Sequence, residues 1–569
     1  MDLVVRNGEV VDGTGRPRRR ADVGVAGGRV VEIGSVVDRG RREIDADGLV
    51  VAPGFVDVHT HFDAQAFWDP TLSPSPLHGV TTVMAGNCGF TIAPLEPSQA
   101  PFLRSMLARV EGMPLASLEA GVPWDWSSTA QYLDRIDSTL SVNAGFMVGH
   151  SALRRVVMGD AGSERTASAE EVTAMCDLLR AGLAAGAIGF STSRSRTHND
   201  AAGNPVPSRL AQSDELVALA EVCGEFAGTS LEYIPDAGPR LSDEDVEMMG
   251  LLSATARRPL NWNLLTVHAG NKDEVSAKLA SADHAARRGG RVVPLTMPVN
   301  IPIRFCLATG FILDMIPGWE KAMALPVDQK LELLRNRDER SNLERLAAAS
   351  AGGVGVANFD DKVILEVHNP DLRRYEGRRL TDIAAETGGS AFDALCEVAC
   401  QDQLRTLFSR AAAAETSEDW KARVGVWRDG RAVIGASDAG AHLDLLATFN
   451  YTTLLLAQAV REHQALPLEE AVHYLTEVPA DLYGLADRGR LASGSRADIV
   501  IFDESTVGSE PIAMRYDLPA SAGRLYAGGQ GIRNVLVSGE EIVCDGVLTD
   551  SRPGVVLRSG RDTITPAMA

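Results

Sequence analysis

The spacing of apolar and polar residues changes twice along this chain. Residues 2–50 hold short β-branched runs separated by Asn-Gly, Asp-Gly and Gly-Gly pairs, which are typical of hairpin turns. After Gly489 the same pattern returns, for example in Asp498–Asp503 and Ile532–Ser538. Both ends are therefore predicted to be β-rich, and their likeness indicates that they pair into one small domain.

The middle of the chain, from Gly54 to about Pro479, alternates short apolar runs with amphipathic stretches. Ala169–Ala185 and Ser213–Phe226 have the apolar spacing of helices. The apolar runs have the length of buried parallel strands: Phe55–Val58, Val80–Ala85, Asn143–Val148, Ile188–Ser191, Arg291–Leu295 and Ala432–Ala436. Repeated alternation over this length predicts an α/β fold, namely a (β/α)8 TIM barrel.

These patterns divide the chain into three parts. We expect residues 1–52 and 486–569 to form the small β domain, and residues 53–485 to form the barrel. Residues 296–380 combine several prolines with a charged helical run near Gln329–Arg345. We interpret them as an insertion into the barrel and as a candidate lid.

Composition narrows the classes of function. With 55 Lys and Arg against 76 Asp and Glu, the net charge is −21, which argues against binding to nucleic acids or anionic membranes. The seven cysteines are scattered and odd in number, which argues against a disulfide framework. We find neither a secretory leader nor an apolar stretch of ~18 residues. We therefore expect a cytoplasmic enzyme for a small molecule, as a monomer or a homo-oligomer.

His59 and His61 form the sharpest local motif. They follow the apolar run Phe55–Val58, and residues two apart in a strand point to the same side. Two imidazoles at the end of a barrel strand can bind one metal ion. A chance pair or ordinary polar packing is the alternative, and the preceding strand with Pro53-Gly54 disfavours it.

Two further strand ends carry side chains that bind metals. Cys88 follows Val80–Ala85, and its thiolate suits zinc, although free cysteines are more often buried structural residues. Asp438 follows Ala432–Ala436 and is a candidate metal ligand and general base, with helix capping as the alternative. Because these residues accompany the histidine pair, we interpret both as metal ligands.

Other polar residues follow strand ends without a decisive pattern. His150 is a candidate ligand or acid–base group. The alternatives are that it packs as an ordinary polar residue or donates a hydrogen bond to a residue of the site. Ser191, Thr192 and Arg194 lie where substrate contacts are expected. Arg154 is a candidate clamp for a carboxylate, because guanidinium groups bind carboxylates in a bidentate way.

These motifs together resemble the amidohydrolase superfamily and, within it, the D-aminoacylase (N-acyl-D-amino-acid deacylase) family. The matching stretches are Val10–Gly15, Ala52–Gln65, His78–Pro94, Val148–Arg154, Gly186–Ser193, Gly435–His442 and Gly489–Asp503. The resemblance implies a (β/α)8 barrel flanked by a β-sandwich from both termini, and zinc at the barrel mouth. It assigns His59 and His61 to one metal position. It also makes Cys88 a ligand of a tightly held zinc and Asp438 the catalytic carboxylate.

One departure from the family concerns the metal site. The family has further histidine ligands at the ends of the fifth and sixth strands. The corresponding positions here hold Glu232 and either Asn261 or Asn263. We therefore predict one zinc ion, with a weakened two-metal site as the alternative. Glu232 is a candidate substitute ligand or acid–base group.

The predicted reaction is hydrolysis of an amide C–N bond by metal-activated water, with Asp438 as general base. The expected substrate is a small-molecule amide, namely an N-acyl-amino acid. A cyclic amide, imide, ureido compound or ester is the alternative, because Glu232 replaces a histidine. A barrel that has lost its metal and its catalysis is a third hypothesis, which the presence of His59, His61 and Asp438 disfavours.

Overall fold

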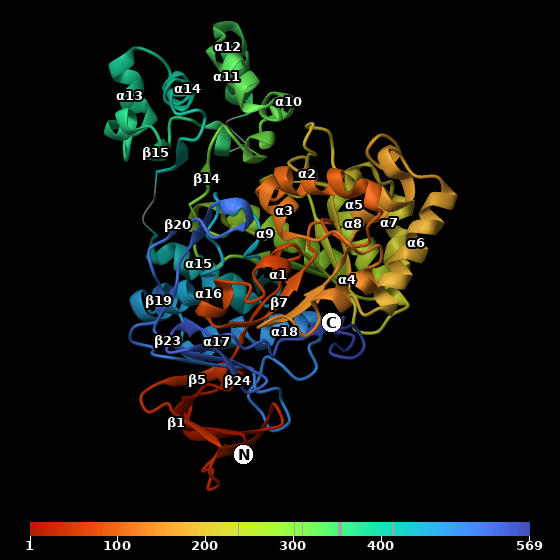
Figure 1. The fold of residues 1–569 in the computed structure, drawn as a ribbon, viewed down its shortest axis with the longest axis vertical. Helices are drawn as coiled ribbons and strands as arrows, with labels where there is room; N and C mark the ends of the chain where they lie inside the picture. The colour runs from red at the N-terminus through yellow and green to blue at the C-terminus, as the bar shows by residue number, and fades with distance from the viewer. Residues whose placement is uncertain (237, 301, 310, 351–354, 412–414, 569) are drawn as a thin grey trace.

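A computed structural model of the protein describes residues 1–236, 238–300, 302–309, 311–350, 355–411 and 415–568. Figure 1 shows a sheet at the N-terminal end, a larger α/β part above it, and a group of helices at the top. In the described residues no helix is both long enough and apolar enough to cross a membrane.

The two chain ends share one sheet of nine strands. Its strands are β1 (Leu3–Val10), β2 (Arg19–Ala26), β3 (Arg29–Gly34), β4 (Arg42–Asp45), β5 (Val50–Pro53), β18 (Ile499–Phe502), β23 (Ile532–Val537), β24 (Glu540–Cys544) and β25 (Val547–Leu548). Strand β5 pairs antiparallel with β18, with Val51 opposite Ile501. The two chain ends are thus joined in one continuous sheet.

At its central strand β18 this sheet buries both of its faces, and side chains alternate between them along the strand. In β18, Ile499 and Ile501 pack into a cluster with Val5 and Val23. The intervening Val500, with Phe502, packs into the large core that continues into the α/β part. The apolar run predicted as a strand therefore attaches the sheet to the rest of the protein.

The α/β part contains two parallel sheets, whose strands follow chain order apart from β26. Their strands are β6 (Phe55–Asp57), β7 (Val80–Ala85), β8 (Asn143–Phe146), β9 (Val148–Gly149), β10 (Gly189–Ser193), β11 (Ser230–Ile234), β12 (Pro259–Trp262), β13 (Arg291–Thr296), β17 (Val433–Ile434) and β26 (Val556–Leu557). One sheet has the order β26-β8-β7-β6 and the other β17-β13-β12-β11-β10-β9. A parallel bridge between Thr60 and Ala439 brings the chain after β6 beside the chain after β17.

Strand β26 departs from the predicted division of the chain. We expected residues 486–569 to belong wholly to the small domain, but Val556 and Leu557 pair with Ala144 and Gly145 of β8. Val556 and Leu557 therefore extend a parallel sheet. No local pattern indicates this, since a two-residue strand carries no period.

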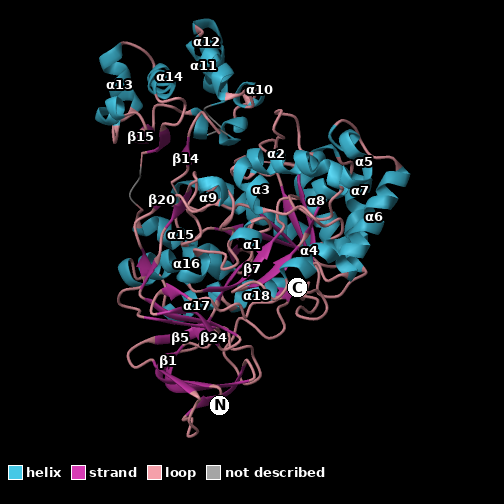
Figure 2. Cartoon of the chain, viewed as in Figure 1, coloured by secondary structure: helices cyan, strands magenta, loops and turns pink. Residues whose placement is uncertain are grey.

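Helices lie around the parallel strands (Figure 2). They are α1 (Gln65–Trp68), α2 (Ala100–Val110), α3 (Leu115–Gly121), α4 (Thr129–Ile136), α5 (His150–Met158), α6 (Ala169–Ala184), α7 (Ser213–Gly224), α8 (Asp243–Ala256), α9 (Lys272–Ala286), α15 (Ser417–Asp429), α16 (Tyr451–Leu454), α17 (Leu468–Leu475) and α18 (Glu477–Tyr483). Ser168 is the N-cap of helix α6 and forms a reciprocal capping box with Glu171. The stretches predicted as helices from apolar spacing coincide with α6 and α7 apart from their last residues.

Between β13 and α15 the chain forms a segment with its own apolar cluster, which we call the insertion. Its elements are β14 (Arg304–Phe305), α10 (Glu320–Met323), α11 (Val327–Arg335), α12 (Arg337–Ser350), β15 (Lys362–Glu366), α13 (Leu380–Thr387), α14 (Ala391–Gln401) and β16 (Leu407–Arg410). Trp319, Phe359 and Phe392 stack at its centre. The predicted range 296–380 includes residues 301, 310 and 351–354, which lie outside the described residues. The fold continues past that range, because β16 pairs with both β14 and β15.

Candidate metal centre

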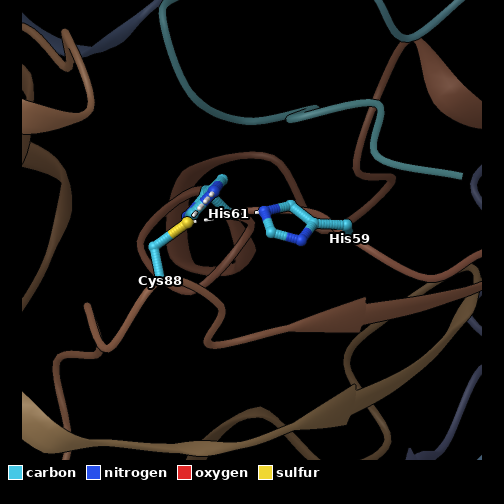
Figure 3. A group of neighbouring side chains, drawn as sticks. All are labelled: His59, His61 and Cys88. Atoms are coloured by element: carbon cyan, nitrogen blue, oxygen red, sulfur yellow. Dashed lines mark hydrogen bonds between the residues drawn. The ribbon is translucent and has the colours of Figure 1, made fainter. Parts of the chain in front are cut away.

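Three side chains that follow neighbouring strands meet in one buried group (Figure 3). His59 and His61 follow β6, and Cys88 follows β7. The Sγ atom of Cys88 lies 3.5 Å from Nε2 of His59 and 3.8 Å from Nε2 of His61. The three donor atoms all lie within 4.8 Å of one another. Imidazole nitrogens and a thiolate are ligands that zinc prefers, so this group can hold a metal ion.

Asp438 lies against the two imidazoles. Its Oδ1 atom is 3.1 Å from Nε2 of His59 and 3.6 Å from Nε2 of His61. The N–H of Asp438 donates to the carbonyl of His59, and the N–H of His61 donates to the carbonyl of Ala439. At Gly440, φ is 91°, and a Cβ atom would lie 2.7 Å from the carbonyl oxygen of His61. This close approach fixes the loop that presents the carboxylate.

Both Cys88 and Asp438 have left-handed backbones, with φ of 59° and 51°. Non-glycine residues adopt this conformation rarely, and it concentrates at ligand-binding positions. For Cys88 the conformation is held by its own N–H, which donates to Oε2 of Glu232 over 2.9 Å. Glu232 therefore contacts the backbone of a candidate ligand.

Glu232 and Asn261 are paired neighbours in β11 and β12. The second carboxylate oxygen of Glu232, Oε1, is buried and has no hydrogen-bond partner among the described residues. Asn261 donates to the carbonyl of Leu231 and to the hydroxyl of Tyr483. Asn263 instead places Nδ2 3.4 Å from Nε2 of His59. Of the two asparagines considered from sequence, Asn263 is the one with a contact to the histidine pair.

Burial and neighbouring charged groups together shift the pKa values in this group. Burial raises the pKa of the Cys88 thiol, and Glu232, Glu111 and Asp438 raise it further. Burial opposes the charged form of His61, but Glu111 and Asp438 outweigh it and raise the pKa of His61 to about 9. Burial also opposes ionisation of Asp438, yet His59 and His61 hold its pKa below the usual range. A divalent cation would offset this negative charge and stabilise the thiolate, so the donor set fits zinc.

His150 and Arg154 contact a carboxylate that is separate from the histidine pair. Nε2 of His150 lies 2.8 Å from Oε1 of Glu215, and Nδ1 lies 2.9 Å from Oγ1 of Thr192. Arg154 donates to both oxygens of Glu215, over 2.7 and 2.6 Å. Both nitrogens of the imidazole and the guanidinium of Arg154 are thus engaged by protein groups. The structure places these sequence candidates in a buried ion network around Glu215.

Ser191 and Arg194, two further candidates for substrate contact, also bind protein groups. The hydroxyl of Ser191 donates to the carbonyl of Gly86 and accepts from the N–H of Gly89. It therefore ties down the turn that carries Cys88. Arg194 donates to the carbonyl of Ala211 and to Glu244.

The ion network around Glu215 can be tested through its effect on protein stability, independently of the metal group. Arg154 is fully buried, so Glu215→Gln leaves its charge uncompensated. We expect a loss of about 3–5 kcal/mol in the free energy of unfolding at neutral pH. Burial alone would raise the pKa of Glu215, but His150 and Arg154 outweigh it and lower that pKa. This stabilisation is therefore present at neutral pH and is lost as the pH falls through the lowered pKa.

Denaturant unfolding of wild type and variant at two pH values measures this effect. Glu225→Gln is the matched control, because its partner Arg180 is exposed and such pairs contribute about 0–1 kcal/mol. Equal losses in the two variants would contradict the prediction.

Glu111 is a site residue that the sequence did not indicate. It follows α2, and its Oε1 atom lies 3.6 Å from Nδ1 of His61, with both side chains buried. Burial raises the pKa of Glu111 to about 7, although His61 opposes the shift. The strand-end pattern that selected the other residues does not apply to a residue at the end of a helix.

Known proteins are similar to this chain over nearly its whole length. Residues 42–366 and 372–543 match the model of the Amidohydrolase family. The D-aminoacylase of Alcaligenes xylosoxydans xylosoxydans is 29% identical over 565 residues, which cover 98% of this chain and 97% of the relative. A D-aminoacylase structure, solved to study its binuclear metal centre, aligns with a TM-score of 0.64 and 27% identity over 98% of this chain and 99% of that chain.

A second solved structure is similar over the same length. It is N-acyl-D-glutamate deacylase from Bordetella bronchiseptica, complexed with zinc and a phosphonate mimic of the tetrahedral intermediate. Its TM-score is 0.64 and its identity 27%, over 98% of this chain and all of that chain. With a family match that spans most of its length, the chain belongs to the amidohydrolase family.

Proposed function

We propose that this protein is a zinc-dependent hydrolase that cleaves the amide bond of N-acyl-D-amino acids. The observation that carries the proposal is the convergence of His59, His61, Cys88 and Asp438, which supplies metal ligands and a carboxylate base in one place. The similarity to D-aminoacylase and N-acyl-D-glutamate deacylase over nearly the whole chain supports the substrate class.

His59, His61 and Cys88 would hold the ion. When bound, zinc is a Lewis acid that polarises a carbonyl and lowers the pKa of water. Asp438 is the member of the group that reaches solvent, since its side chain is 24% exposed while those of His59 and His61 are 0% and 3% exposed. The Asp438 carboxylate takes the proton of the attacking water and returns it to the leaving nitrogen.

We also propose that the two parallel sheets act as one (β/α)8 barrel. Support comes from the chain order of β6, β7, β8 with β9, β10, β11, β12, β13 and β17, and from the bridge between Thr60 and Ala439. In such a barrel, active sites lie at the carboxyl ends of the strands, where His59, Cys88 and Asp438 stand. In this proposal residues 1–52 and residues 486–569 apart from β26 form the small domain, residues 53–485 together with β26 form the barrel, and the insertion is its lid.

A substrate panel tests the proposed activity. We expect the zinc-loaded protein to hydrolyse N-acetyl-D-amino acids faster than their L-enantiomers and to leave hydantoin and dihydrouracil intact. Release of the free amino acid is followed by ninhydrin or by mass spectrometry. Turnover confined to the cyclic compounds would favour the cyclic-amide alternative. A protein that holds zinc but cleaves none of these compounds would support loss of catalysis.

Metal content is a separate prediction. We expect one zinc ion per chain, because Glu232 and Asn263 stand where a second ion would need further nitrogen ligands. Chelation should abolish turnover, and one equivalent of zinc should restore it. Elemental analysis counts the ions, and anomalous diffraction at the zinc edge identifies the ligands. Two zinc ions per chain at full occupancy would contradict this prediction.

A further inference from the structure

Glu111 faces the nitrogen of His61 that points away from the other ligands. Nε2 of His61 lies near Cys88 and Asp438, at 3.8 and 3.6 Å, whereas Nδ1 lies 3.6 Å from Oε1 of Glu111. His61 and Glu111 side chains are each only 3% exposed. An imidazole whose second nitrogen is held by a carboxylate has its tautomer and ring orientation fixed for metal binding.

His59 has no such partner in the part of the chain that the structure describes. Its Nδ1 atom is buried and has no hydrogen-bond partner among the described residues. Its Nε2 atom faces Cys88, Asp438 and Asn263. Of the two histidines, His61 is therefore the one with a carboxylate, Glu111, within ion-pair distance of its Nδ1 atom.

The backbone of Glu111 contacts the loop that carries Asp438. Its carbonyl accepts the N–H of His442, over 2.5 Å, in the loop that begins with Asp438. The N–H of Glu111 donates to the carbonyl of Leu107, so the residue ends α2. One residue at a helix end thus contacts both the histidine pair and the Asp438 loop.

The same helix end is attached to the insertion. Arg109 donates to Oδ1 of Asp314 over 2.5 Å and to the carbonyl of Thr309 over 2.6 Å. It also donates to the carbonyl of Met323 over 3.3 Å. The side chains of Arg109 and Asp314 are 8% and 1% exposed, so this contact is sealed from solvent. The insertion therefore contacts Arg109, and the metal group contacts Glu111, two residues later in the chain.

We propose that Glu111 is a positioning residue for the metal ligand His61, and that Arg109 couples the seating of the insertion to metal binding through the same helix end. The inference rests on the proposed zinc site and goes beyond it, because it assigns a role to residues that touch neither metal nor substrate. It concerns zinc affinity, which can be measured without any substrate.

Zinc affinity of Glu111→Gln tests the positioning role. Glutamine preserves the shape of the side chain but removes the carboxylate that fixes His61, and loss of such a partner typically costs about 10–100-fold in metal affinity. Competition with a chromophoric chelator measures zinc affinity in wild type, in Glu111→Gln and in Glu111→Asp. The matched control is Glu119→Gln, at an exposed glutamate of the next helix.

The outcomes separate this inference from the proposed function. Weaker zinc binding in Glu111→Gln, with partial recovery in Glu111→Asp and none lost in Glu119→Gln, supports the positioning role. An affinity within about threefold of wild type overturns it while the zinc site stands. A wild type that binds no zinc overturns both proposals. Circular dichroism of the zinc-free variants checks their fold, and if Glu111→Gln does not fold, the Glu111→Asp affinity decides.

A double-mutant cycle tests the coupling. We expect Asp314→Asn, which weakens the hold of the insertion on Arg109, to lower zinc affinity by about 2–30-fold. In the Glu111→Gln background the same change should have little further effect on zinc affinity, because the contact between Glu111 and His61 is already weakened. Glu386→Gln, at an exposed ion pair within the insertion, is the control. Unchanged affinity in Asp314→Asn, or effects that simply add, overturns the coupling.

Discussion

Asp438→Asn is expected to lower kcat by about 10²–10⁴-fold, the contribution of a positioned acid–base group. Asparagine keeps the shape of the side chain and readily adopts the left-handed backbone of residue 438, where φ is 51°. The amide cannot take a proton from water at neutral pH. His59, His61 and Cys88 remain, so we expect the zinc content to stay near that of the wild type.

This experiment needs both activity and metal analysis on the same sample. Asp177→Asn is the matched control, since Asp177 lies on the surface of α6 with a side chain that is 69% exposed. A variant at residue 438 that keeps its zinc and also works within about threefold of wild type would remove Asp438 from the role of base. Loss of zinc together with activity would show that Asp438 acts first as a ligand.

The sequence predicts the site residues that come shortly after an apolar strand. His59 and His61 follow one apolar strand, Cys88 follows the next, and Asp438 follows another. Parallel strands gather their carboxyl ends at one edge, so residues hundreds of positions apart come together without any sign in the local sequence. The bridge between Thr60 and Ala439 is the contact that brings Asp438 to the histidines.

The parts that sequence misses depend on tertiary contacts of single residues. Glu111 lies at a helix end, and only the packing of α2 brings it to His61. His150 stands directly after a strand, as the candidate ligands do, but Glu215 and Thr192 take both of its ring nitrogens. Position after a strand therefore selects candidates, and the hydrogen-bond partners decide among them.

The second large effect is expected from removal of either histidine. His59→Ala and His61→Ala should each lower zinc affinity by more than about 100-fold. Removing a metal ligand weakens metal binding more than removing the residue that orients that ligand. Activity should fall in parallel. Zinc at 100 times its Kd stabilises a folded protein by about 2.7 kcal/mol, so the thermal shift on adding zinc to wild type should vanish in both variants.

His368→Ala is the control for these variants, since His368 is exposed and lies in the insertion. Elemental analysis and the zinc-dependent shift in Tm together measure the outcome. Full zinc occupancy in either site variant would place the metal elsewhere. Glu111 lies against His61, whereas His59 Nδ1 has no partner among the described residues. If Glu111 positions His61 as proposed, Glu111→Gln should have no effect on zinc affinity in the His61→Ala background and should still weaken it in His59→Ala. That asymmetry would show which imidazole the helix end positions.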